Sequence, residues 1–248
     1  MTPILLAAEV TKRFGGLLAC NGLSLAVRPG EIHALIGPNG AGKSTAIGLL
    51  SGEIAPDSGS IRFGGADVTR LGIAARVRTG LTRSFQITTI LPQFTALQNV
   101  ALVAQVRAGH SFHFWADAHR DAALVDPARA MLERVGLGKR AQVPAEDLAH
   151  GEQRQLELAM ALMTGARMLL LDEPMAGLGA TESQQMTAQL AALKGSLTVL
   201  LVEHDMDAVA ALADQVSVMV AGRVIATGSF AEMQASQAVR DAYLGAHA

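Results

Sequence analysis

Gly37-Pro38-Asn39-Gly40-Ala41-Gly42-Lys43-Ser44-Thr45 is the most specific sequence pattern in this 248-residue chain. It follows an apolar run of strand character, Ile32–Ile36, and precedes Ala46–Leu50, which can continue as a helix. Glycines let the backbone turn so that successive N–H groups point into one concavity, and a helix start adds its positive end. The pattern therefore predicts a phosphate-binding loop whose nine residues all contact a bound nucleotide. In it, Lys43 reaches the β- and γ-phosphates and the Ser44 hydroxyl binds Mg²⁺.

The overall composition limits the classes of function. The formal net charge is −2, which argues against broad attraction to nucleic acid. Cys20 is the single cysteine, so an internal disulfide is impossible and a reducing compartment is expected. No apolar stretch approaches the roughly 18 residues that span a bilayer, and Met1–Val10 lacks the features of a signal peptide. We therefore expect a soluble, cytoplasmic protein that meets membranes only through partners.

Apolar runs and turn residues predict an α/β core that is interrupted by a helical insertion. Two of the strands are apolar without alternation, as expected when a parallel sheet is covered on both faces. Pro29-Gly30, Gly64-Gly65 and Ala221-Gly222 are expected to close hairpins. The predicted strands are Leu5–Val10, Ser24–Val27, Glu31–Ile36, Ser60–Phe63, Arg83–Phe85, Met168–Leu171, Thr198–Val202, Gln215–Val220 and Arg223–Thr227, and the predicted helices are Thr95–Arg107, Pro127–Val135 and Glu152–Met163.

Two carboxylates follow the apolar run Met168–Leu171 directly. The carboxyl end of a parallel strand is where ligands bind in open α/β sheets, so Asp172 can hold Mg²⁺ there, commonly through water. Glu173 projects in a different direction and can act as a general base on the attacking water. The alternative, a solvated acidic turn, is disfavoured by the phosphate loop in the same chain.

His204 follows a second buried strand, Thr198–Val202, after Glu203. A histidine beside the same crevice can polarise the γ-phosphate or orient water, although a structural hydrogen bond is the plainer alternative. We expect Lys43, Glu173 and His204 to be the catalytic residues. Leu148-Ala149-His150-Gly151-Glu152 opens a buried helix and exposes N–H groups to an anion, a weak signal when it stands alone.

In chain order the phosphate loop is followed by Ser84-Phe85-Gln86, by Leu148–Glu152, by Leu169–Pro174 and by His204. This series resembles the ATPase subunit of ABC transporters over essentially the entire chain. The resemblance implies an α/β fold, a P-loop NTPase core of ABC ATPase type with an N-terminal antiparallel β-subdomain and an inserted α-helical subdomain. It implies an ATP-binding core at 1–86 and 165–235, a helical subdomain at 87–164 and a tail at 236–248.

The same resemblance assigns further residues to ATP and Mg²⁺. It implies that Gln86 senses Mg²⁺ and couples the site to the helical insertion, so that Ser44, Gln86 and Asp172 form the metal site. It implies that Phe14 stacks on adenine, with burial in the core as the alternative. It also implies that His150, Gly151 and Glu152 meet the ATP held by a second ATPase subunit, identical or different.

Within this family the chain is most similar to ATPases for uptake of branched-chain, hydrophobic amino acids. That likeness implies transmembrane permease subunits, a periplasmic solute-binding protein and a place on the cytoplasmic face of the inner membrane. A related system for urea, aromatic acids or lipid is the alternative, followed by a soluble ABC-type ATPase and, more distantly, a kinase. The segments that carry the likeness are Ala34–Gly40, Leu97–Val100, Gly151–Glu157, Asp172–Leu178, Gly222–Gly228 and Val239–Gly245.

Two segments depart from the family pattern. Leu148-Ala149-His150-Gly151-Glu152 stands where many members have Leu-Ser-Gly-Gly-Gln, so backbone N–H groups and His150 would have to carry the contact to the second subunit's ATP, and Glu152 places a carboxylate at the helix start. Gly179 replaces the usual acidic or amide residue in the loop after Glu173. Separately, His110–Trp115 gathers three aromatic residues that would contact a partner or pack locally, and the histidines around it form a poor metal-ligand pattern.

Overall fold

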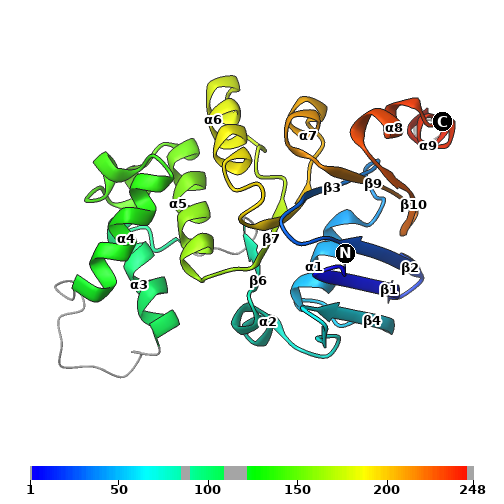
Figure 1. Ribbon diagram of the computed structural model, residues 1–248, viewed down its shortest axis with the longest axis horizontal. Coiled ribbons are helices and arrows are strands. Elements are labelled where there is room, and N and C mark those ends of the chain that lie inside the picture. Colours follow the sequence, from blue (N-terminus) through cyan, green and yellow to red (C-terminus); the bar gives the residue numbers. More distant parts are fainter. Residues whose placement is uncertain (1, 85–89, 109–121, 245–248) are drawn as a thin grey trace.

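The computed structural model describes residues 2–84, 90–108 and 122–244 (Figure 1). Its centre is a six-stranded sheet in the order β10-β9-β3-β8-β7-β6. The pairs from β9 through to β6 are parallel, and β10 is antiparallel to β9 at one edge. The strands of this sheet are β3 (Ile32–Ile36), β6 (Leu81–Ser84), β7 (Met168–Asp172), β8 (Thr198–Val202), β9 (Gln215–Val220) and β10 (Arg223–Gly228).

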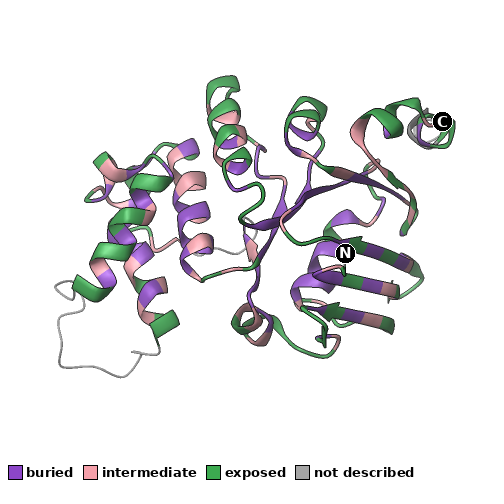
Figure 2. Cartoon of the chain, viewed as in Figure 1, coloured by how far each residue is buried: buried purple, intermediate pink, exposed green. Residues whose placement is uncertain are grey.

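Both faces of the central strands are covered, which explains why their sequences are mostly apolar without alternation. Every residue of β3, β7 and β8 is buried (Figure 2). Successive side chains of a strand point to opposite faces. In β7, accordingly, Leu169 and Leu171 join one hydrophobic cluster, while Met168 and Leu170 join another. The prediction of parallel strands covered on both sides is confirmed.

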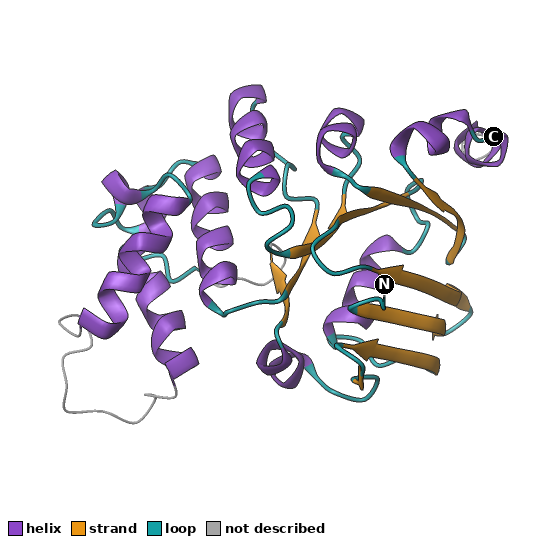
Figure 3. Ribbon diagram, viewed as in Figure 1, coloured by secondary structure: helices purple, strands orange, loops and turns teal. Residues whose placement is uncertain are grey.

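A second, antiparallel sheet lies beside the first in the order β2-β1-β4-β5 (Figure 3). Helix α1 (Lys43–Ser51) packs with this sheet and with one face of the central sheet, because Ile47 and Leu50 share a cluster with residues of both. The helix that begins at the phosphate loop is therefore clamped between two sheets. The strands of the second sheet are β1 (Leu5–Phe14), β2 (Leu17–Val27), β4 (Ser58–Phe63) and β5 (Ala66–Asp67).

Between β6 and β7, the described residues form three helices that group at one end of the molecule (Figure 1). They are α3 (Ala96–Ala108), α4 (Ala122–Arg134) and α5 (His150–Met163), with the short turns η2 (Gly138–Arg140) and η3 (Ala145–Asp147) between the last two. The remaining helices are α2 (Ile73–Thr79), α6 (Ala180–Ala191), α7 (Met206–Leu212), α8 (Phe230–Ala235) and α9 (Gln237–Leu244). The predicted fold class, an α/β core with an antiparallel sheet and inserted helices, is confirmed, whereas the residue limits of the subdomains stay a prediction. Among the described residues, we find no helix with both the length and the hydrophobicity needed to cross a membrane.

Three local predictions were wrong. Pro29-Gly30 does not close a hairpin, because β2 and β3 belong to different sheets and the Gly30 N–H donates to the Thr198 hydroxyl. Pro127 lies inside α4 rather than at its start, since the apolar face of that helix continues across the proline through Leu124, Ala128 and Leu132. The first two strands are longer than predicted because they form one hairpin that turns at Gly15-Gly16.

The end of α1 is anchored by a buried arginine from α2. Arg76 is 1% exposed, and its Nη1 donates to the carbonyls of Leu49 and Leu50, each at 2.7 Å. Its Nε and Nη2 donate to the carbonyls of Leu71 and Thr69. Burial lowers the pKa of Arg76 to about 10, so the guanidinium stays charged at neutral pH. The last carbonyls of a helix have no partner within the helix, and Arg76 supplies one.

We expect Arg76→Met to lower the free energy of unfolding by about 3 kcal/mol, because it leaves the buried Leu50 carbonyl without its side-chain donor and removes one of two donors from the Leu49 carbonyl. Arg78→Met, at an exposed position of the same helix, is the control and should change stability by less than about 0.5 kcal/mol. Urea unfolding followed by circular dichroism measures both values. Equal stabilities for the two variants would contradict this account of Arg76.

Candidate nucleotide-binding site

The predicted phosphate loop joins β3 to α1, and α1 begins at Lys43. Gly40 and Gly42 have positive φ angles of 78° and 99°, a region that favours glycine. A Cβ atom on Gly42 would lie 2.3 Å from the carbonyl oxygen of Ala19 in β2. Gly42 is thus required both by its backbone conformation and by the close approach of the neighbouring sheet. It is also the N-cap of α1 and offers no side chain to cap the helix, which leaves the helix start to an anion.

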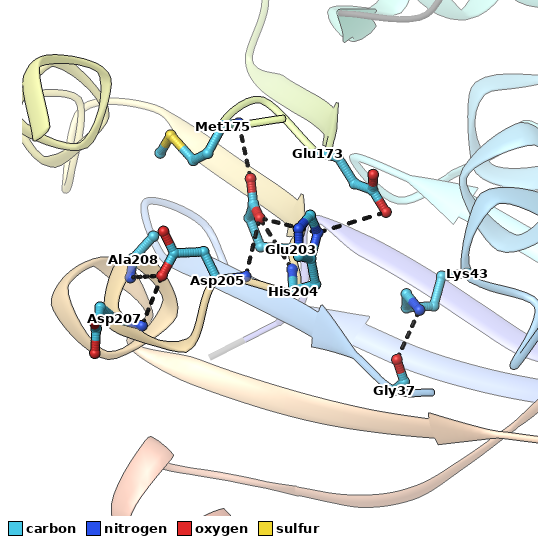
Figure 4. A network of polar contacts seen from close by, with 9 residues as sticks. All are labelled: Gly37, Lys43, Glu173, Met175, Glu203, His204, Asp205, Asp207 and Ala208. Atoms are coloured by element: carbon cyan, nitrogen blue, oxygen red, sulfur yellow. Dashed lines mark hydrogen bonds and ion pairs between the residues drawn. The ribbon is translucent and has the colours of Figure 1, made fainter. Parts of the chain in front are cut away.

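Lys43 folds back over the loop that precedes it (Figure 4). Its Nζ donates to the carbonyl oxygens of Gly37 at 2.7 Å and Pro38 at 3.1 Å. Burial lowers the pKa of the Lys43 ammonium, while the charges of Glu173 and Asp172 oppose that change. The structure therefore brings the loop lysine and the two strand-end carboxylates within electrostatic reach of one another.

A cavity of about 550 Å³ opens beside the loop, a size within the range of small-ligand sites. Its lining consists of Leu17–Ala19, Asn39–Thr45, Glu173 and Ala221-Gly222. Phe14, proposed to stack on adenine, is 47% exposed and is not among the residues that line this cavity. It pairs with Leu17 across the β1–β2 hairpin, and the Lys12 ammonium lies 5.6 Å from the centre of its ring. Sequence reasoning missed Leu17, which lines the cavity itself.

Asp172 ends β7 and is held by a cation from the neighbouring strand β6. Arg83 Nη2 donates to Asp172 Oδ2 at 3.0 Å, and Arg83 Nη1 donates to Glu53. Burial raises the pKa of the Asp172 carboxyl, and the Arg83 guanidinium opposes that rise. Oxygen donors of this kind are the ligands that Mg²⁺ prefers, so Asp172 and Ser44 fit the predicted metal. Gln86 lies outside the described residues, as does the aromatic stretch 110–115.

Glu173 follows Asp172 in an unusual backbone conformation, with a φ angle of 52°. Its N–H donates to the carbonyl of Val202 at the end of β8, at 2.9 Å. The carboxylate is half-exposed and lies 3.9 Å from His204 Nδ1, measured from its Oε1. Figure 4 shows Glu173 and His204 facing each other on the side toward Lys43. Three residues predicted to be catalytic thus come from the ends of three adjacent strands.

The predicted signature residues His150, Gly151 and Glu152 form the first turn of α5. Glu152 Oε2 accepts a hydrogen bond from the N–H of Ala149 at 3.0 Å, which caps the helix. His150 is exposed, and none of the three lines the cavity beside Lys43. Their predicted contact with nucleotide therefore has to involve the ATP of another subunit, and it stays a prediction.

Sequence reasoning missed Glu203, the residue between β8 and His204. Its side chain is buried and accepts hydrogen bonds from the N–H groups of Met175 and His204 at 2.9 and 3.0 Å (Figure 4). The available signal was an ionisable residue placed directly after a fully apolar strand, where a buried carboxylate requires several donors.

Comparison with known proteins identifies the family. A family model described as "ABC transporter" matches residues 20–176. The high-affinity branched-chain amino acid transport ATP-binding protein BraF of Pseudomonas aeruginosa is 38% identical over 252 residues, covering 98% of each chain. The chain belongs to the ABC transporter ATP-binding family. The members of this family are the ATP-hydrolysing subunits of transporters.

Further comparisons agree with this ABC family assignment. The LivG protein of Escherichia coli, a high-affinity branched-chain amino acid transport ATP-binding protein, is 36% identical over 250 residues and covers 98% of each chain. A second family model, described as "Branched-chain amino acid ATP-binding cassette transporter", matches residues 223–248. The ADP conformation of MJ1267, an ATP-binding cassette of an ABC transporter, has a TM-score of 0.87 and 30% identity, and the match covers 99% of this chain and 100% of that one. A nucleotide-free cassette has a TM-score of 0.85 and 28% identity, with 98% and 99% covered.

We expect Gly42→Ala to abolish high-affinity nucleotide binding, because the added methyl group would collide with the Ala19 carbonyl and displace the loop. Gly65→Ala is the matched control: Gly65 also has a positive φ angle, 85°, a Cβ there meets no atom within 4 Å, and it does not line the cavity. Its cost should be limited to backbone strain of about 1 kcal/mol in stability. Calorimetric titration with ATP, together with thermal unfolding, separates the two effects. Equal losses in both variants would show that the close approach to β2 does not matter.

Proposed function

We propose that this chain is the ATP-hydrolysing subunit of an ABC importer, which couples ATP-driven closure of an ATPase pair to uptake of branched-chain or other amino acids. The observation that carries the proposal is the cavity in which Lys43 of the phosphate loop and the carboxylate of Glu173 line one space. Phosphate binding and a base for the attacking water are two of the functions that nucleotide hydrolysis uses. The substrate class is supported by the names of the relatives BraF and LivG and by the family match at 223–248.

In this proposal the backbone N–H groups of Gly37–Thr45 and the Lys43 ammonium hold the triphosphate. Lys43 exchanges its bonds with the loop carbonyls for bonds with phosphate oxygens. The hydroxyl of Ser44, the carboxylate of Asp172 and the side chain of Gln86 would hold Mg²⁺, and the metal would supply charge neutralisation for the phosphates. Phe14, with Leu17 on the facing strand, covers the adenine.

Glu173 is placed to act as the general base. Its carboxylate accepts a proton from water, and the oxygen of that water attacks the γ-phosphorus while the bond to the β-phosphate oxygen breaks, giving ADP and phosphate. His204, 3.9 Å from Glu173, orients the water or stabilises charge on the transferring group. Fixed charges of this kind act most strongly once bulk water is excluded.

A second ATPase subunit completes the site in this proposal. The exposed His150, with the N–H groups at Gly151 and Glu152, contacts the nucleotide held by the partner's phosphate loop. ATP then binds more tightly to the closed pair than to the open one, and this difference in affinity is what drives the conformational change. Gly179 leaves the loop after Glu173 without the usual polar side chain at the subunit contact.

Transmembrane permease subunits are the proposed partners on the membrane side, and a periplasmic solute-binding protein is an indirect partner. Helix α3 supports this proposal, because Leu102 and Val106 are exposed apolar residues on it, with Val106 65% exposed. The chain would then be peripheral on the cytoplasmic face of the inner membrane.

We expect Glu173→Gln to reduce kcat for ATP hydrolysis by at least about 100-fold while ATP binding survives, because the amide cannot accept the proton from water. Closed dimers should accumulate with ATP and be detected by light scattering. Lys43→Ala is the contrasting variant and should weaken ATP binding itself by roughly 10-fold or more. Normal hydrolysis by Glu173→Gln would remove Glu173 as the base.

The transport proposal is tested by reconstituting the chain with its copurifying permease subunits in proteoliposomes. Addition of the cognate solute-binding protein loaded with leucine, isoleucine or valine should stimulate ATP hydrolysis, because the loaded protein favours the closed pair. The same binding protein without ligand is the control. Stimulation by urea or aromatic acids instead would replace the proposed substrate class and leave the ATPase assignment intact.

A further inference from the structure

We propose that Glu203 is a positioning residue, whose buried carboxylate sets the distance between Glu173 and His204 by binding main-chain N–H groups on both sides of the pair. The inference rests on the proposed ATPase activity, because Glu203 acts through two residues assigned to that reaction. Glu203 does not line the cavity beside Lys43, so it has no direct access to the phosphates.

The Glu203 side chain is 0% exposed and spans two loops (Figure 4). Its Oε1 accepts the N–H of Met175, two residues after Glu173, at 2.9 Å. Its Oε2 accepts the N–H of His204 at 3.0 Å and the N–H of Asp205 at 3.3 Å. One carboxylate therefore ties the loop that follows β7 to the loop that follows β8.

The choice of donors distinguishes Glu203 from an ordinary buried ion pair. Buried carboxylates usually have a cationic partner. In the part of the chain that the structure describes, no lysine or arginine forms an ion pair with Glu203, and the nearest ring nitrogen, His204 Nδ1, is 3.8 Å from Oε2. Main-chain N–H groups supply the compensation, so the carboxylate fixes backbone positions rather than a side chain.

The turn at Glu173 needs such support. A φ angle of 52° in a residue other than glycine costs on the order of 1 kcal/mol, and it persists only where the surroundings impose it. Three hydrogen bonds impose it here: Glu173 N–H to the Val202 carbonyl, Ala176 N–H to the Glu173 carbonyl, and Met175 N–H to Glu203. Without the third bond the turn can relax toward a common conformation, which would swing the Glu173 carboxylate away from His204.

The other side of the pair is fixed in the same way. The main chain of His204 lies between Glu203, which binds its N–H, and Asp205, which caps α7 by accepting the N–H groups of Asp207 and Ala208. The His204 ring is 67% exposed, so its position depends on its backbone more than on packing. Glu203 is the one carboxylate in Figure 4 that binds the backbone on both sides of the 3.9 Å approach.

Glu203→Gln tests this inference, because the change keeps the shape and removes one acceptor. The amide oxygen can keep the two donors at His204 and Asp205, so the amide nitrogen faces the N–H of Met175 and repels it. Hydrogen exchange at the Met175 amide, measured by mass spectrometry on the nucleotide-free chain, should become faster. The kcat for ATP should fall on the order of 100-fold, while the KM and the dissociation constant for ATP change by less than about twofold.

Glu232→Gln is the matched control. Glu232 also accepts a main-chain N–H, that of Ser229 at 2.6 Å, but it is exposed at the start of α8. This variant should leave kcat and Met175 exchange unchanged. A merely structural role for Glu203 predicts a smaller folded fraction with normal kcat per folded molecule, and that result would overturn the inference. Wild-type kcat with unchanged Met175 exchange would also overturn it.

Failure of the proposed function would look different. If the wild-type chain does not hydrolyse ATP, or if Glu173→Gln hydrolyses it normally, the ATPase assignment is wrong whatever Glu203 does. If both behave as expected and Glu203→Gln alone is fully active, the assignment stands and the positioning role is refuted.

Discussion

The parallel pairing of β3, β8 and β7 determines which residues come together at the candidate site. Leu35 pairs with Val202, and Val202 pairs with Asp172, so the three strands end at the same edge of the sheet. The phosphate loop leaves that edge from β3, Glu173 from β7, and Glu203 with His204 from β8. Lys43 and Glu173, which are 130 positions apart in the sequence, thus line one cavity because the strand register brings both to this edge.

The second sheet makes this edge into a nucleotide site. The Ala19 carbonyl in β2 lies so close to Gly42 that the loop has no room for a Cβ atom there. Leu17 and Leu18 of the same strand line the cavity. Clamping α1 between two sheets also buries Lys43, which lowers the pKa of its ammonium by desolvation. The charges of Glu173 and Asp172 at the end of β7 oppose that shift. The pKa of Lys43 therefore depends both on its burial and on these two carboxylates.

The site motifs could be predicted from the sequence because each one directly follows a strand of the central sheet, and the end of that strand fixes its position. The strands Thr198–Val202 and Gln215–Val220 have the predicted limits, since the first is followed directly by Glu203 and the second by the turn at Ala221-Gly222. The start of α4 was wrongly predicted at Pro127 because burial of the apolar helix face outweighs the low helix propensity of proline. Glu203 was missed because its partners are backbone groups brought close by the fold, which no pattern of side chains records.

Three acids at this sheet edge have different surroundings, and the surroundings separate their roles. Burial raises the pKa of the Asp172 carboxyl, while the adjacent Arg83 guanidinium opposes that rise and favours the charged form that could hold a cation. Glu203 is buried against main-chain N–H groups, which suits it to hold loops. Of the three, Glu173 alone lines the phosphate-loop cavity, and it is half-exposed with a histidine 3.9 Å away. It is therefore the carboxylate whose surroundings allow it to meet water and accept a proton.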